Sequence, residues 1–243
     1  DLVYSLAIVK KMAPGVNFQV TLNNIERCVA QYGYRPDEVD PAHRGRFTEK
    51  DYELLKPLLK RQSYIDQVNK WRAGEPDPDV DLDRFRGTLF RGFEGNYVQA
   101  YHIAFNLPFT MADYDTPWLE AEPNMVSPIV ISRTPRYRDP NGDAQWQNLV
   151  KDVALRSNAI FVGTPTEHED FQRTVEQIIP FYPVQDFLHL ANLIAGAELV
   201  MANQNFVYSL AMGLGKQAVL ETIKIKPLQN NECFFPRSNI TYF

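Results

Sequence analysis

The chain has 243 residues, of which 44% are hydrophobic and 12% aromatic, and its formal net charge is -5. This apolar content is too high for an intrinsically disordered protein, and no apolar run approaches the ~20 residues of a membrane span. The net negative charge provides no broad basic field, so we expect no nucleic acid partner.

The first half of the sequence predicts helices and strands in no regular order. Pro14 and Gly15 end a first helical pattern, and Thr48 is typical of the N-cap of a later helix, in which Pro57 predicts a kink or a break. The expected helices span residues 2–12, 23–31, 48–62 and 95–107, and the expected strands span residues 17–22 and 64–71.

An acidic segment, GEPDPDVDLD, occupies residues 74–83. It concentrates carboxylates, but it lacks the central glycine and the closing Glu of an EF-hand calcium loop, and two prolines stiffen it. We therefore predict a solvated connection there, with a metal site as the minor alternative.

After residue 127 the sequence alternates between apolar runs and helical patterns. The preceding segment, residues 108–127, has prolines, acids and no periodicity, which predicts a linker between domains of residues 1–125 and 126–243. Apolar strands that alternate with helices indicate a parallel sheet covered on both faces, so the second domain is expected to be Rossmann-like. Strands are expected at 128–132, 159–163, 178–182, 199–202 and 217–220, and helices at 144–156, 167–177, 187–197 and 206–214.

Polar residues follow these strands, at the edge where parallel sheets bind ligands. Arg133, Arg136 and Arg138 come directly after the first strand of the second domain, and guanidinium groups suit the bidentate recognition of phosphate. A solvated basic loop is the alternative interpretation of these three residues. Their position after a strand favours the ligand.

Two further turns carry candidate residues. After Gly163 and Thr164, Thr166 is a candidate N-cap, and Glu167 is either an acceptor for a sugar hydroxyl or a carboxylate favoured by the helix dipole. In the turn Asn203-Gln204-Asn205, the last residue is expected to cap the next helix, and the main-chain N–H groups after it remain available for phosphate. In that helix, Ala211 and Gly213 permit close packing, and Gly215 is a good C-terminal stop.

Cys28 and Cys233 belong to no CxxC or Cys/His cluster, which predicts two free thiols in a reducing compartment. The sequence does not open with a basic segment followed by an apolar core, as a signal peptide would. We therefore expect a cytoplasmic protein.

The order GTPTEHEDF, then LHLANLIAGAELVMANQNFVYSLAMGLG, resembles the C-terminal domain of the family 9 glycosyltransferases, the ADP-heptose:lipopolysaccharide heptosyltransferases. The first residues, DLVYSL, are similar to the segment after that family's first strand. The resemblance is clear at residues 1–6 and 160–221 and weak between them. It implies an α/β fold of GT-B type, in which two Rossmann-like domains with parallel sheets face a cleft, and it places the family's first strand before residue 1.

The resemblance also implies roles for individual residues. Asp1 would be the general base that deprotonates the acceptor hydroxyl, and Arg136 or Arg138 would neutralise the leaving diphosphate. Glu167 would contact the nucleoside, and Asn205 with the following N–H groups would hold the phosphates. The full set of expected donor-binding residues is Arg133, Arg136, Arg138, Gly163, Thr164, Glu167, Asn203, Gln204 and Asn205.

The implied activity is inverting, metal-independent transfer of a hexose or heptose from a nucleotide-diphosphate sugar, without a cofactor, to a glycan or lipid-linked acceptor. Peripheral contact with a membrane is left open. Gln204 stands where the family has an acid, and Ser209 stands where a histidine is common, so the donor is not implied to be heptose. The alternative is a non-catalytic nucleotide- or glycan-binding protein that retains the fold. A Rossmann oxidoreductase is not favoured, because no GxGxxG follows a strand.

Overall fold

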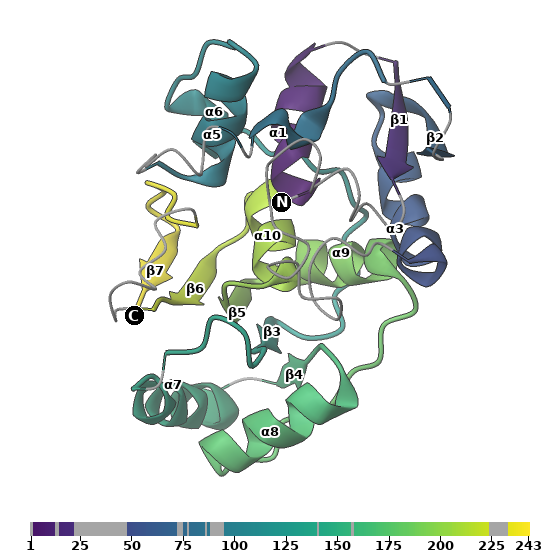
Figure 1. The fold of residues 1–243 in the computed structure, drawn as a ribbon. Helices are drawn as coiled ribbons and strands as arrows, with labels where there is room; N and C mark the ends of the chain where they lie inside the picture. The colour runs from purple at the N-terminus through teal and green to yellow at the C-terminus, as the bar shows by residue number, and fades with distance from the viewer. Residues whose placement is uncertain are drawn as a thin grey trace, which may run out of the picture.

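Two parallel sheets form the framework of the part of the protein that the structure describes (Figure 1). The structure is a computed structural model, and it describes residues 2–12, 15–21, 48–71, 75–76, 78–85, 87, 95–139, 141–156, 158–223 and 233–243. The first sheet pairs β1 (Val16–Thr21) with β2 (Ile65–Trp71). The second has the order β4 (Ala159–Phe161), β3 (Ile129–Ser132), β5 (Leu199–Asn203), β6 (Ala218–Glu221) and β7 (Ile240–Tyr242). Every pairing between the described strands is parallel, which confirms the predicted α/β class.

The predicted helices of the first half are present where the structure describes the chain. They are α1 (Leu2–Met12), α3 (Glu49–Arg61) and α5 (Tyr97–Ala104), and the shorter elements η1 (Leu82–Phe85) and α6 (Ala112–Asp115) accompany them. Thr48 caps α3 as predicted, since its side chain accepts from Asp51 N while the Asp51 carboxylate accepts from Thr48 N at 2.9 Å. The expected helix over residues 23–31 lies outside the described residues.

Two details of these helices differ from expectation, although a kink at Pro57 stays a prediction. No break occurs at Pro57, because α3 runs through it and buries residues on both sides of the proline, among them Leu55 and Leu58. The predicted helix over 95–107 is shorter at both ends. Asn96 caps its start, and Asn106, with a φ of 53°, follows its end in a left-handed conformation.

The helices of the second half cover both faces of the five-stranded sheet. In Figure 1, α7 (Asp143–Arg156) and α8 (Pro165–Val175) lie on one side, and α9 (Phe187–Gly196) and α10 (Phe206–Gly213) lie on the other. Strand residues alternate between these layers. Ile131 and Met201 pack with Trp146 of α7, whereas Val130, Val200 and Ala202 belong to the core that contains α9 and α10. The doubly covered sheet predicted from the apolar strands is therefore confirmed.

Two elements at the sheet edges differ from expectation. The predicted strand at residues 178–182 makes only an isolated bridge from Phe181 to Phe161, because Pro180 lacks the N–H that a ladder requires. At the other edge, β7 was not predicted, since it has only three residues and no distinctive pattern.

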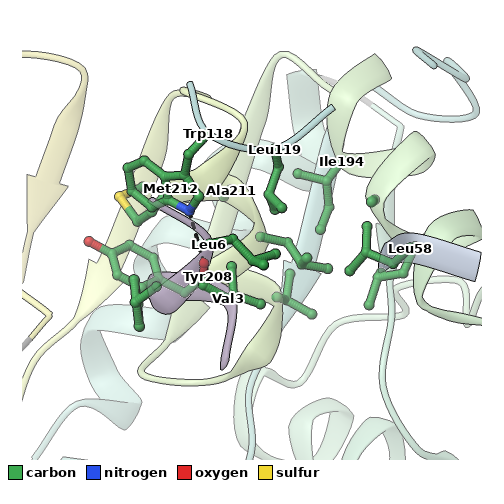
Figure 2. Close-up of a cluster of buried hydrophobic side chains, with 14 of the residues drawn as sticks. Val3, Leu6, Leu58, Trp118, Leu119, Ile194, Tyr208, Ala211 and Met212 are labelled. Atoms are coloured by element: carbon green, nitrogen blue, oxygen red, sulfur yellow. Dashed lines mark hydrogen bonds between the residues drawn. The ribbon is translucent and has the colours of Figure 1, made fainter. Parts of the chain in front are cut away.

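Helix α1 packs on α10, and Trp118 and Leu119, from the segment before β3, pack against this contact (Figure 2). The Trp118 and Leu119 amides both donate to Gly213 O at 2.9 Å, and Trp118 Nε1 donates to Val3 O at 3.0 Å. A Cβ on Gly213 would lie 2.6 Å from a Leu119 methyl carbon, so glycine is needed for this approach. The close approach at Gly213 is therefore to a non-helical segment rather than to the helix that was expected, whereas the stop at Gly215, which has a φ of 69°, is confirmed.

No helix in the described part of the chain has the length and apolarity needed to cross a membrane. Among the same residues, no group of three or more His, Cys, Asp or Glu side chains is arranged to hold a metal ion.

Candidate functional site

The carboxyl ends of β3, β5 and β6 meet at one edge of the second sheet, and Asn203 lies at the centre of that edge. Its side chain is fully buried. Asn203 Oδ1 accepts from Thr134 N at 3.0 Å, and Asn203 Nδ2 donates to Thr134 O and Arg136 O, each at 2.9 Å. One amide therefore fastens the loop after β3 across the end of β5.

The turn that follows Asn203 leads into α10 and contains main-chain donors without a partner among the described residues. Asn205 is the N-cap, as predicted, because its Oδ1 accepts from Tyr208 N at 3.1 Å. Within the described residues, the amides of Phe206 and Val207 have no acceptor, and the Gln204 side chain makes no hydrogen bond. The open N–H groups and the positive end of the helix dipole favour an anion at this turn.

Arg133 has a different role from the phosphate contact expected for it. It is 4% exposed, and its Nε and Nη2 donate to the two Glu221 oxygens at 2.8 and 2.5 Å. The third nitrogen, Nη1, donates to Asp143 at 2.8 Å. Because each nitrogen already has a carboxylate partner, Arg133 forms a structural ion pair rather than a site for a ligand.

Arg138 is also paired within the protein. Its guanidinium donates to Asp143, to Asp170 at 2.8 Å and to Thr174 at 3.0 Å. Burial raises the pKa of Asp143, but hydrogen bonds from Arg138 and Arg133 outweigh it and hold that pKa below its usual value. Two guanidinium groups thus lie among three carboxylates, and this part of the loop carries no excess positive charge.

Arg136 is the arginine of this loop that remains available. It is exposed, donates to Tyr137 Oη at 2.8 Å and lies 4.6 Å from the centre of the Tyr137 ring. It forms no ion pair with any carboxylate in the described part of the chain. Asn203 binds the Arg136 carbonyl, so the backbone of this residue is joined to the turn that begins α10.

The turn after β4 corrects one expectation. Thr164, not Thr166, caps α8, and Glu167 Oε2 accepts from Thr164 N at 2.8 Å and from its hydroxyl at 2.9 Å. Pro165 explains the choice, since proline is favoured at the first helical position and Glu167 then falls at the third. Gly163, with a φ of 154°, precedes the cap. Ligand contacts by Gly163, Thr164 and Glu167 stay predictions.

We expect Thr164→Ala to lower the free energy of unfolding by about 1 kcal/mol, because it removes the capping box of α8. Thr166→Ala is the matched control and should change stability by less than about 0.5 kcal/mol, because Thr166 is exposed and makes no side-chain hydrogen bond. Urea denaturation followed by circular dichroism measures both values. Equal losses in the two variants would contradict the assignment of Thr164 as the cap.

Some expected site residues cannot be placed and others were missed. Asp1 and Cys28 lie outside the described residues. Ser209 is buried, and its hydroxyl donates to Asn205 O at 3.2 Å. Glu221 was not predicted from the sequence. Its position directly after an apolar run was the available signal, because a carboxylate buried there needs a partner.

Two aromatic rings flank the α10 turn. Phe187 and Phe206 open α9 and α10, and their ring centres are 4.5 Å apart. Both are partly exposed, so an apolar surface lies beside the open N–H groups.

Comparison with known proteins gives matches to solved structures alone, since no protein-family model and no curated protein matches the sequence. The family 9 glycosyl transferase from Veillonella parvula DSM 2008 is 14% identical, with a TM-score of 0.51 over 100% of this chain and 82% of that one. The E. coli heptosyltransferase WaaC with ADP-2-deoxy-2-fluoro heptose is 14% identical, with a TM-score of 0.50 over 100% of this chain and 89% of that one. The chain has the fold of the family 9 glycosyltransferases.

The same fold is found in E. coli WaaC with ADP, which is 13% identical, with a TM-score of 0.51 over 99% of this chain and 88% of that one. The resemblance and the GT-B-type fold expected from the sequence are therefore confirmed. At these identities the comparison establishes the fold, and the activity has to be argued from the site.

Proposed function

We propose that this protein transfers a sugar from a nucleotide-diphosphate donor to a glycan or lipid-linked acceptor, with inversion and without a metal. The observation that supports the proposal is the β5–α10 turn, where Asn203 binds the main chain of Arg136 and also contacts Asn205, the N-cap before the open N–H groups of α10. E. coli WaaC, which has this fold, has been solved with ADP and with ADP-2-deoxy-2-fluoro heptose. A diphosphate is the ligand whose charge such a turn complements.

In this proposal the acceptor oxygen attacks the anomeric carbon as the bond from that carbon to the diphosphate breaks. Asp1 takes the hydroxyl proton, and the diphosphate leaves with the bonding electron pair. Arg136 and the α10 amides stabilise the charge that develops on the leaving group. Glu167 contacts the nucleoside, and Gln204 donates or accepts a hydrogen bond at a sugar hydroxyl.

Arg136→Gln should weaken binding of a nucleoside diphosphate on the order of tenfold, because a charge-assisted hydrogen bond is lost from an otherwise intact turn. Isothermal titration calorimetry with ADP, GDP and UDP measures the effect. Arg173→Gln is the control, since that arginine lies on α8 with its side chain 75% exposed. If none of the three nucleotides binds the wild-type protein, the proposed function fails.

The second candidate is a nucleotide- or glycan-binding protein without catalysis. It is favoured by the pairing of Arg133 and Arg138 with three carboxylates, which leaves one arginine of the loop for a leaving group. Turnover separates the two candidates. Sugar transfer or slow donor hydrolysis, abolished by Asp1→Asn with donor affinity nearly intact, would exclude the binding protein.

A further inference from the structure

The loop of residues 133–139 is pinned at three places. Arg133 at its start bonds both Glu221 oxygens, and the Asp139 amide at its end donates to Glu221 Oε1 at 3.2 Å. Asn203 holds the middle through the carbonyls of Thr134 and Arg136. Glu221 and Asn203 are paired residues on neighbouring strands, so the loop is fixed to the rigid sheet rather than to another loop.

Asn203 also contacts the second anion-binding element. Its Oδ1 accepts from Asn205 Nδ2 at 3.1 Å, and Asn205 is the residue that caps α10. The same buried amide therefore touches the loop that carries Arg136 and the N-cap beside the open amides of Phe206 and Val207. A change at Asn203 affects the spacing between the two groups.

The Asn203 side-chain amide restrains the backbone around Arg136. The Arg136 carbonyl accepts from Asn203 Nδ2 at 2.9 Å and from the Thr134 hydroxyl at 3.0 Å. Tyr137 follows with a φ of 58°, a left-handed conformation that a non-glycine residue adopts only when its surroundings hold it there. The Arg136 side chain then rests on the Tyr137 hydroxyl and ring.

We infer that Asn203 is a positioning residue that sets Arg136 at the distance from the α10 amides at which both groups bind one diphosphate. The inference rests on the proposed function. Asn203 does not itself contact the ligand in this arrangement, because its oxygen and nitrogen are already used and its side chain is fully buried. Preorganised groups bind an anion more tightly than mobile ones, because their ordering cost is met during folding.

Asparagine, and not aspartate, suits this position. The two carbonyls that face the side chain need a donor, and the Thr134 amide needs an acceptor. Asn203→Asp keeps the shape but places a carboxylate oxygen against two carbonyls in a buried site. Thr134→Val is a milder change, since it removes one exposed hydrogen bond to the same Arg136 carbonyl.

A double-mutant cycle tests the inference, with the affinity for ADP, GDP or UDP measured by calorimetry on the whole protein. Arg136→Gln should cost on the order of tenfold in the wild-type background. In the Asn203→Asp background it should cost less than about twofold, because Arg136 is no longer held beside the turn. Thr134→Val serves as the second background if Asn203→Asp does not fold, and it should reduce the effect of Arg136→Gln in the same direction.

Each result decides a separate question. A wild-type protein that binds none of the nucleotides overturns the proposed function and the positioning role with it. Binding by the wild type with a full tenfold effect of Arg136→Gln in every background overturns the positioning role alone. Hydrogen exchange at the Thr134 amide, without ligand, should be about tenfold faster in Asn203→Leu, which removes the acceptor of that amide, and unchanged exchange also overturns it.

Discussion

Glu221→Ala is expected to lower the free energy of unfolding by about 3–5 kcal/mol, because it leaves the Arg133 guanidinium buried without its main partner. The side chains of Glu221 and Arg133 are 1% and 3% exposed, so water cannot replace the lost carboxylate. The Asp139 amide also loses its acceptor. Urea denaturation at neutral pH, followed by circular dichroism and tryptophan fluorescence, measures the change.

The double variant Arg133→Met with Glu221→Leu is the control for this interpretation. Replacing both members of a buried ion pair by apolar residues of similar size is often neutral or stabilising, so this variant should be more stable than Glu221→Ala. Asp170→Asn gives the surface reference, because its pair with Arg138 is partly exposed and should cost less than about 1 kcal/mol. A loss in Glu221→Ala no larger than in Asp170→Asn would show that the buried pair is not what stabilises this edge.

The same ion pair shows why the arginine loop was only partly predictable. The sequence places Arg133, Arg136 and Arg138 after a strand, and that position was predicted correctly. Which of them is free depends on Glu221, 88 residues away from Arg133, and on Asp170, 32 residues away from Arg138. Asp143 is a local partner of both arginines, but Glu221 and Asp170 lie far along the chain. All three arginines were therefore expected to contact phosphate, with Arg136 or Arg138 at the leaving diphosphate, whereas among the described residues Arg136 alone of the three has no carboxylate partner.

The elements of the second half were more accessible to sequence reasoning. Continuously apolar runs predicted β3, β5 and β6, and the cap at Asn205 followed from the local chemistry of an amide before an apolar helix. Edge elements were less predictable. The segment around Pro180 has the hydrophobicity of a strand, but proline removes a ladder donor, and β7 is too short to show a period.

The segment at residues 108–127 shows a different limit. Its prolines, acids and lack of periodicity predict a linker between domains, and Trp118 and Leu119 within it are 2% and 4% exposed. Their burial depends on Gly213, which lies far along the chain and offers one carbonyl to both amides. An aperiodic segment can thus contribute core residues when it packs against a glycine that is distant in the sequence. No local pattern in the segment indicates that partner.

We expect Trp118→Ala to lower the free energy of unfolding by about 3–5 kcal/mol, the range measured for deleting a buried aromatic side chain. The indole lies between α1 and α10 (Figure 2), donates to Val3 O, and has the Arg237 guanidinium 5.5 Å from its ring centre. Its removal leaves a cavity between the first helix and the helix that carries the candidate site. Urea denaturation measures the loss, and nucleotide affinity in the folded variant reports whether α10 has shifted.

Two matched variants separate the causes of that loss. Trp118→Phe keeps an aromatic ring against Gly213 and Leu119 but loses the hydrogen bond to Val3, so it should cost about 1 kcal/mol beyond the change in packing. Trp71→Ala removes a half-buried tryptophan from β2, away from this contact, and should destabilise less. If Trp118→Ala were no more destabilising than Trp71→Ala, the burial of Trp118 would add little to stability. Residues 108–127 would then behave as the linker that their composition predicts, and the packing of α1 on α10 would not require them.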